Sequence, residues 1–236
     1  MVNTIKRRAS MRVALFGATG MVGQGVLREC LRDDAVSQIV CVGRSSLGMT
    51  HPKLEELVTK DLFELERLDG QLRGLDACFF CLGVSSGGMS EADYRRLTYD
   101  LTLSVAGVLA RVNPGMTFVY VSGDGTDSSE QGRSMWARVK GATENALLRL
   151  PFRAAYMFRP GVIAPLDGIR SKTPSYRVFY AVLGVLLPPL QRLFPRSIST
   201  TRTIGLAMLE VARHGAKTSI LGPADIHAAA GMGEAR

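Results

Sequence analysis

The chain has 236 residues, of which 46% are hydrophobic and 21% are charged, and this ordinary globular composition excludes a largely disordered or fibrous protein. Its formal net charge of +8 comes from scattered basic residues, without a recognised nucleic-acid-binding module, so we expect no specific nucleic-acid partner. The positive charge instead suits solubility and the attraction of an anionic cofactor.

Residues 1–10 form a short, polar and basic head that we expect to be flexible, and it lacks the apolar core of a signal peptide. The four cysteines all lie within apolar segments, which indicates buried, reduced thiols and no disulfide framework. We therefore expect a cytoplasmic protein whose residues 11–236 form a single domain.

A glycine-rich turn follows the first expected strand. Four apolar residues, Val13 to Phe16, precede it, and apolar residues at helical spacing follow it, so the pattern predicts strand, tight turn and helix. Glycines at this spacing allow a sharp exit from the strand, close approach to a pyrophosphate and packing of the helix on the sheet. An ordinary glycine-rich connection that binds nothing is the alternative. The candidate cofactor-binding residues of the turn are Gly17, Thr19, Gly20, Met21, Val22 and Gly23.

A second strand is expected over Ser37–Val42, and Gly43-Arg44-Ser45-Ser46 follows it. Dinucleotide folds that select NAD(H) place an acidic residue here, whereas an arginine accommodates the 2′-phosphate of NADP(H). Arg44 therefore favours NADP(H) over NAD(H), although a solvated loop arginine is the alternative.

Two further strands are expected to border the cofactor. The first, Leu54–Thr59, is followed by Asp61 and Leu62, whose aspartate can accept from an adenine amino group or simply cap a turn. The second, Leu75–Leu82, is continuously apolar, as in a strand buried on both faces, and Gly83 closes it. We expect Leu82 and Gly83 to lie beside the cofactor, because ligands bind at the carboxyl ends of such strands.

Helices and strands then alternate. We expect a helix over Met89–Val112, a strand over Thr117–Val121 that leads into a polar loop, a helix over Ser134–Leu150 and a strand over Ala154–Phe158. This alternation predicts an α/β fold with a doubly wound, mostly parallel Rossmann sheet that has helices on both faces.

Four local patterns resemble the short-chain dehydrogenase/reductase superfamily, specifically its atypical, extended-like members and the small Tat-interacting oxidoreductase-like branch. They are Gly17–Gly23, Cys81–Gly83, Ser122 after the fifth strand, and Arg159-Pro160-Gly161 after the sixth, in matching order over residues 11–165. The resemblance implies an NAD(P)-binding protein in which Pro160 and Gly161 also contact the cofactor.

In that superfamily a serine, a tyrosine and a lysine carry the chemistry, the last two spaced Tyr-x-x-x-Lys on one helix. Here Ser122 and Lys140 match, but Trp136 occupies the tyrosine position. An indole has no proton that titrates near neutral pH, so Trp136 cannot act as the general acid or base. The proton donor is left open among Tyr94, Tyr99 and Asp124.

Two functions follow from these residues. One is an oxidoreductase, or an epimerase-like enzyme, that acts on a small carbonyl or sugar-like substrate. The other is a non-catalytic NADP(H)-binding sensor or interaction module, which the tryptophan at the tyrosine position motivates.

Residues 162–236 are expected to form a small helical elaboration that caps the substrate side. Within it, the apolar run Val178–Leu187 is much shorter than the ~18 residues that span a bilayer, so we expect no transmembrane segment. Its apolar character on all sides favours a helix that covers the cleft or packs in a homodimer interface. A shallow membrane contact, aided by Arg177, Arg192 and Arg196, is the weaker alternative. Residues 200–214 are expected to form an amphipathic helix, followed by a short strand at residues 219–221. The isolated histidines indicate no metal site.

Overall fold

The computed structural model of the chain describes residues 10–166 and 198–234. The predictions for the basic head at residues 1–9 and for the apolar run Val178–Leu187 fall outside the described residues. No helix in the two described ranges combines the length and the apolar character that crossing a membrane requires.

Strands of the described residues form a seven-stranded sheet in which every neighbouring pair is parallel, which confirms the predicted doubly wound α/β fold. The strand order is β3-β2-β1-β4-β5-β6-β9. The bounds are β1 Met11–Phe16, β2 Val36–Gly43, β3 Leu54–Val58, β4 Ala77–Phe80, β5 Thr117–Val121, β6 Ala154–Phe158 and β9 Ile220–Leu221.

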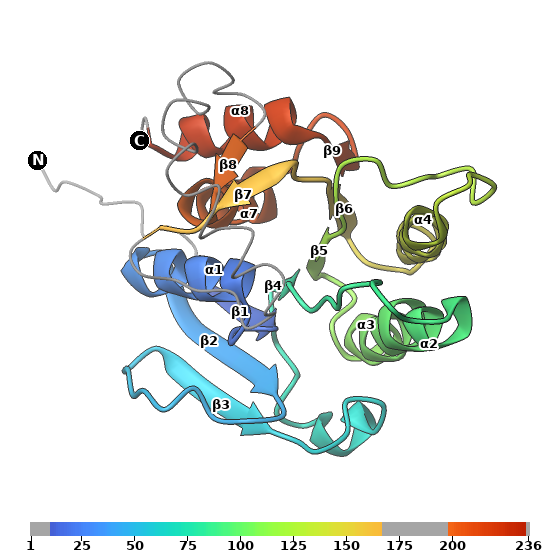
Figure 1. The fold of residues 1–236 in the computed structure, drawn as a ribbon. Helices are drawn as coiled ribbons and strands as arrows, with labels where there is room; N and C mark the ends of the chain where they lie inside the picture. The colour runs from blue at the N-terminus through green and yellow to red at the C-terminus, as the bar shows by residue number, and fades with distance from the viewer. Residues whose placement is uncertain (1–9, 167–197, 235–236) are drawn as a thin grey trace, which may run out of the picture.

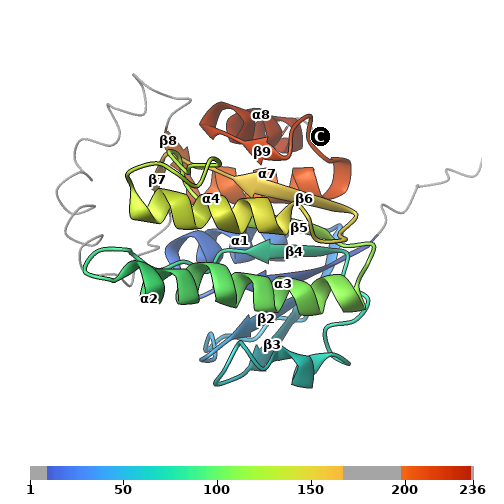
Figure 2. The same ribbon diagram turned by 90° about the vertical axis from the view of Figure 1, so that its right-hand side faces the viewer.

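Helices cover both faces of the sheet (Figure 1). One face carries α1 (Met21–Arg32), α7 (Thr201–His214) and α8 (Pro223–Glu234). The other carries α3 (Leu101–Val112) and α4 (Met135–Leu147), together with the short α2 (Glu91–Arg95) and the 3-10 helix η1 (Leu65–Leu68). Figure 2 shows α2 and α3 as one continuous rod, joined by the π-helical turn η2 (Arg96–Asp100).

Alternate residues of each central strand enter the two cores. Val13 and Leu15 of β1 are fully buried on the side of α1 and α7, whereas Ala14 and Phe16 are fully buried on the side of α3. Burial on both faces explains why the central strands read as continuous apolar runs in the sequence.

The predicted strands at β5 and β6 are confirmed residue for residue, while other elements differ at their ends. The helix expected over Met89–Val112 begins at Glu91, because the Ser90 hydroxyl caps it by accepting from Asp93 N at 3.1 Å. The helix expected to reach Leu150 ends at Leu147. The elements that were not predicted include the 3-10 helix η1, the parallel pair β7 (Val162–Ala164) and β8 (Ile198–Thr200), and α8.

The strand order reverses between β1 and β4, which are neighbours in the sheet although β2 and β3 separate them in the chain. In open α/β sheets ligands bind at such a switch point, outside the carboxyl ends of the strands. The turn after β1 and the loop after β4 therefore mark where a binding site is expected.

Candidate functional site

A cavity of about 750 Å³ opens at this switch point. It lies between the turn after β1, the loop after β4, the loop after β5, the first turns of α4 and the segment after β6. Most of the residues predicted for cofactor and substrate line it: Gly17, Thr19, Gly20, Met21, Val22, Arg44, Leu82, Gly83, Ser122, Trp136, Lys140, Pro160 and Gly161.

The three glycines of the turn have different surroundings. Gly17 has a φ of 81°, and a Cβ built on it lies 2.8 Å from backbone atoms of Cys81 and Leu82, so the turn packs directly on the end of β4. A Cβ on Gly23 lies 2.1 Å from Gly17 O, so this glycine lets α1 pack on the turn and does not line the cavity. Gly20 does line it, and its Cβ meets only Gly17 O, at 3.3 Å.

The N-terminus of α1 faces the same cavity, and α1 itself supplies no acidic side chain there. Gly20 is the N-cap and supplies no side-chain acceptor, and the first turn of α1 contains no acidic residue. The first amide groups of a helix lack intrahelical partners and carry the positive end of its dipole. Because Met21 and Val22 line the cavity, the geometry of this helix end suits an anionic ligand.

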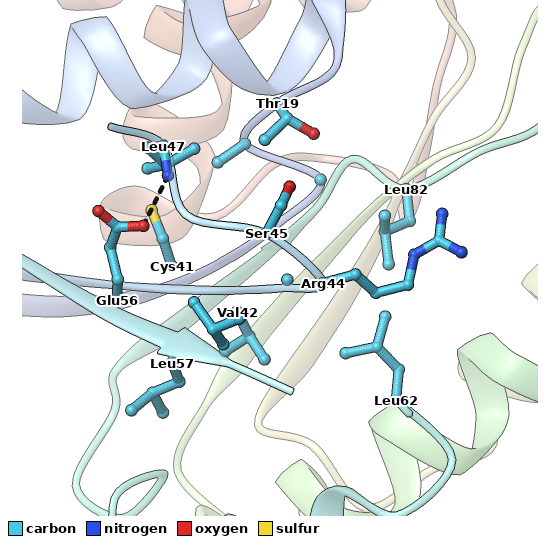
Figure 3. Close-up of a pocket in the computed structure, with 14 residues that line it drawn as sticks. Thr19, Cys41, Val42, Arg44, Ser45, Leu47, Glu56, Leu57, Leu62 and Leu82 are labelled. Atoms are coloured by element: carbon cyan, nitrogen blue, oxygen red, sulfur yellow. Dashed lines mark hydrogen bonds between the residues drawn. The ribbon is translucent and has the colours of Figure 1, made fainter. Parts of the chain in front are cut away.

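A second cavity of about 210 Å³ shares Gly17, Thr19, Arg44 and Leu82 with the first. Figure 3 shows it between the loop after β2 and strand β3, with the Arg44 side chain extending towards Leu62 and Leu82. Its apolar walls are Val42, Leu57, Leu62 and Leu82. The Arg44 guanidinium is exposed and has no hydrogen bond or ion pair with any other described residue.

Asp61 lines neither cavity. Its side chain accepts from Phe63 N at 2.8 Å and so caps a turn, which is the alternative that the sequence left open for it. Glu56 does line the smaller cavity, and the sequence analysis did not single it out. No motif marks Glu56, since it is one of two adjacent glutamates in the middle of β3.

Trp136 and Lys140 lie one turn apart on α4 at the opposite end of the larger cavity. The six-membered ring of Trp136 packs on the loop after β5, where a Cβ built on Gly125 lies 3.6 Å from Cη2. Lys140 Nζ donates to Ser122 O at 2.9 Å and lies 5.5 Å from the centroid of the Tyr120 ring. Burial lowers the pKa of Lys140 to about 8, although the charge of Glu144 opposes the shift.

The Ser122 hydroxyl is engaged by a buried ion pair. Its Oγ lies 2.5 Å from Glu144 Oε1 and 3.0 Å from Phe158 O, so its single proton has two protein acceptors. Glu144 is fully buried and is paired with Arg159, which also donates to Ser128 Oγ. Ser122 thus belongs to a network that ties α4 to the ends of β5 and β6, a link that the sequence did not reveal.

Individual relatives, and not a family model, identify the family of this chain. No protein-family model matches it. It is 30% identical over 180 residues to "Protein fmp52, mitochondrial" of Emericella nidulans, covering 73% of this chain and 76% of that protein. It is 29% identical over 154 residues to "Protein HTATIP2" of Rattus norvegicus, covering 64% and 62%. The chain belongs to the atypical short-chain dehydrogenase/reductases, in the branch of fmp52 and HTATIP2.

Solved structures agree with this family at the level of the fold. A short chain dehydrogenase/reductase from Saccharomyces cerevisiae superposes with a TM-score of 0.63 at 14% identity, covering 92% of this chain and 97% of that one. The Bordetella bronchiseptica enzyme WbmF, solved in complex with NAD⁺, superposes with a TM-score of 0.67 at 15% identity, covering 97% and 79%.

This atypical short-chain dehydrogenase/reductase needs a proton donor other than Trp136 if it is catalytic. Of the three alternatives from the sequence, Tyr94 and Asp124 line the larger cavity. Tyr99 does not line it, and the Arg95 guanidinium lies over its ring, 4.1 Å from the centroid. The described part of the reductase-like site therefore offers Asp124, Tyr94 and Lys140 as groups that can exchange a proton.

The cysteines offer no comparable chemistry. Burial raises the pKa of Cys41 to about 12 and raises the pKa of Cys81, which lines the larger cavity, still further. Thiols with such values are poor nucleophiles because almost no thiolate is present near neutral pH. Among the residues described for this protein, no group of histidine, cysteine or acidic side chains is arranged to hold a metal ion.

Proposed function

We propose that this chain binds NADP(H), in preference to NAD(H), across the two cavities and acts as an oxidoreductase on a small carbonyl or sugar-like substrate. The observation that carries the proposal is the continuity of the site. The two cavities share the glycine turn and Arg44, and the larger one extends from there to Trp136 and Lys140.

The glycine turn fits the pyrophosphate of a dinucleotide. Gly20 leaves space at the cavity wall, and the uncapped N-terminus of α1 supplies amide donors and a positive dipole end. A side chain at position 20 would fill the space through which the phosphates approach the backbone. This arrangement supports a bound dianionic linker at Gly17–Gly23.

The smaller cavity fits the adenosine end. Its apolar walls can enclose the adenine ring, while Arg44 and Ser45 stand at its rim with side chains that have no partner among the described residues. A 2′-phosphate carries a charge that a guanidinium pairs strongly in bidentate geometry. Arg44 therefore supports the preference for NADP(H) over NAD(H).

The larger cavity fits the nicotinamide end and a substrate. A nicotinamide cofactor supplies hydride chemistry when it is bound. Lys140 is positioned to hold ribose hydroxyl groups and, with its pKa near 8, to exchange a proton close to neutral pH. Trp136 can pack against a substrate and donate one hydrogen bond to a carbonyl oxygen.

Calorimetric titration tests the binding proposal. Arg44→Asp should weaken NADPH at least about tenfold, since loss of a charge-assisted bond and gain of repulsion exceed 1.4 kcal/mol, and should change NADH little. Arg149→Asp is the charge-matched control, because Arg149 is exposed and lines neither cavity. Equal losses for NADPH and NADH would refute the contact between Arg44 and the 2′-phosphate. Absence of NADPH binding at millimolar concentration would refute the function.

A second candidate is a non-catalytic NADP(H)-binding sensor or interaction module. Trp136 has no titratable proton, and the Ser122 hydroxyl is engaged by Glu144, so two of the three groups that carry the family's chemistry are changed or occupied. NADPH oxidation with a panel of small carbonyl compounds separates the two candidates. Turnover by the wild-type protein refutes the sensor. Turnover that appears only in Trp136→Tyr supports a chain that has lost catalysis.

Three further expectations belong to this proposal. Residues 162–236 would cap the substrate side, to which Val162 and Ile163 already contribute cavity-lining atoms. A homodimer is expected, and light scattering would test it. The proposed location is the cytoplasm. The fungal relatives are named mitochondrial, so fractionation of cells that express the tagged chain would decide between the two compartments.

A further inference from the structure

Strand β3 holds both ends of the loop that carries Arg44. At the start of the loop, Gly43 O accepts at 2.9 Å from the N–H of Thr59, the residue that directly follows β3. Four residues later, Leu47 N donates to Glu56 Oε2 at 2.7 Å, as the dashed line in Figure 3 marks. The loop is thus fixed at two points to the neighbouring strand.

Glu56 makes the second attachment with both carboxylate oxygens. Besides Oε2, its Oε1 accepts from the Ser46 hydroxyl at 3.3 Å. Glu56 pairs with Cys41 in the β2–β3 register, so its backbone is set by the sheet and not by the loop. A half-buried carboxylate with two donors from one loop is a strong local restraint, since hydrogen bonds to charged groups exceed neutral ones.

Between the two attachment points lie Arg44 and Ser45, whose side chains have no hydrogen-bond or ion-pair partner among the described residues. Figure 3 shows Arg44 and Glu56 on opposite sides of the pocket, with Ser45 between them. Glu56 therefore restrains the loop from the side of the pocket opposite Arg44, and it makes no ion pair with the Arg44 guanidinium. An acid in an adenosine pocket usually favours the 2′-hydroxyl of NAD(H), but here the loop occupies the carboxylate.

We infer that Glu56 is a positioning residue for cofactor selectivity, which acts on the 2′-phosphate of NADP(H) through the loop that presents Arg44 and Ser45. This inference rests on the proposed function, because it presupposes a nucleotide in the smaller cavity. In this role the acid of the pocket binds the protein's own loop and supports NADP(H), whereas an acid that binds a ribose hydroxyl directly would favour NAD(H).

The test compares two adenosine fragments, 2′,5′-ADP and 5′-AMP, by calorimetric titration of the full chain, so no catalytic activity is needed. Glu56→Ala should weaken 2′,5′-ADP roughly fivefold to tenfold, which corresponds to about one hydrogen bond of ordinary net strength, and should change 5′-AMP less than about twofold. Glu56→Gln should restore most of the affinity, because the amide oxygen can still accept from Leu47 N.

A double-mutant cycle tests whether Glu56 acts through Arg44. In the Arg44→Ala background, Glu56→Ala should cause a clearly smaller loss of 2′,5′-ADP affinity than it causes in the wild type, because only Ser45 is then left to position. Should Glu56→Ala fail to fold, Ser46→Ala removes one of the two contacts of Glu56 with the loop. It should also weaken 2′,5′-ADP more than 5′-AMP, but by a smaller factor.

Three results would overturn the inference. Tighter 2′,5′-ADP binding in Glu56→Gln would mean that the carboxylate only repels the phosphate. Equal loss of both fragments in Glu56→Ala would mean a purely structural role. Independent losses in the double-mutant cycle would mean that Glu56 does not act through Arg44. A wild-type protein that binds neither fragment would instead refute the proposed function, and the inference with it.

Discussion

The glycine turn allows a sharp prediction, because its glycines have separable roles. In Gly23→Ala the new Cβ would lie 2.1 Å from Gly17 O and 2.6 Å from Gly17 C, which are backbone atoms that cannot rotate away. Helix α1 would have to move off the turn. Overpacking usually costs 1–3 kcal/mol, and for so short a contact we expect about 3 kcal/mol or more. At 2–4 °C per kcal/mol for a chain of this size, the Tm should fall by roughly 6–12 °C.

In Gly20→Ala the Cβ meets one atom at 3.3 Å, and the backbone at position 20 has an ordinary extended conformation. The loss of stability should stay within about 1 kcal/mol, the usual range for changes at an N-cap. The affinity for NADPH should nevertheless fall at least about tenfold, because the methyl group occupies the space for the pyrophosphate.

Thermal denaturation followed by circular dichroism, together with calorimetric titration of NADPH, measures both effects. Gly107→Ala is the matched control, since Gly107 lies on α3 with nothing within 4 Å of its Cβ, and a glycine-to-alanine change there should stabilise slightly. A Gly23→Ala protein with the wild-type Tm would refute the packing argument. Wild-type NADPH affinity in Gly20→Ala would refute the assignment of this turn as the pyrophosphate site.

Further predictions concern buried charge and thiols. The pKa of Lys140 is about 8, below its ordinary value of 10.5. Between pH 8 and pH 10.5, Lys140 is therefore mostly deprotonated in the folded protein but protonated in the unfolded chain. The free energy of unfolding should rise with pH over this range, because the unfolded state binds more protons. The Tm of the wild type relative to Lys140→Met should therefore rise from pH 7 to pH 10, and a constant difference would contradict this. Glu144→Ala leaves Arg159 without its buried partner and should lower the urea-derived free energy of unfolding by about 3 kcal/mol; a loss under about 1 kcal/mol would contradict the pairing. Burial raises the pKa of all four thiols, so a thiol reagent at pH 8 should label the native protein far more slowly than the denatured one, and rapid native labelling would exclude buried cysteines.

The parts of the fold that the sequence predicts are those set by local pattern. Strands β5 and β6 are apolar runs between polar turns, and the glycine turn is recognisable from the spacing of its glycines between an apolar strand and a helix. The pair β7–β8 escapes prediction, since each strand has three residues and its hydrogen bonds depend on a partner distant in the chain. Helix α8 is rich in alanine and glycine and has no marked apolar stripe, so its sequence lacks a helical period.

The residues of the candidate site also fall into two groups, those marked by a local sequence pattern and those that depend on contacts between distant parts of the chain. Residues of the turn and Arg44 could be predicted because motif and position in a strand–turn–helix unit place them. Glu56 and Glu144 could not be predicted, because an acid within a strand or helix that belongs to no motif looks like a solvated side chain. Only the folded chain brings Glu56 to Leu47 N, and Glu144 to Ser122 across 22 positions.

Trp136 is the only tryptophan of the chain, and it lies in the wall of the larger cavity. The protein's intrinsic indole fluorescence therefore originates at one end of the site. A reduced nicotinamide ring bound there would accept excitation energy from the indole, whereas a fragment confined to the adenosine end, such as 2′,5′-ADP, would leave the emission nearly unchanged. The side chain that replaces the family's tyrosine thus gives the unmodified protein a built-in optical probe that distinguishes occupancy of the two ends of the cleft.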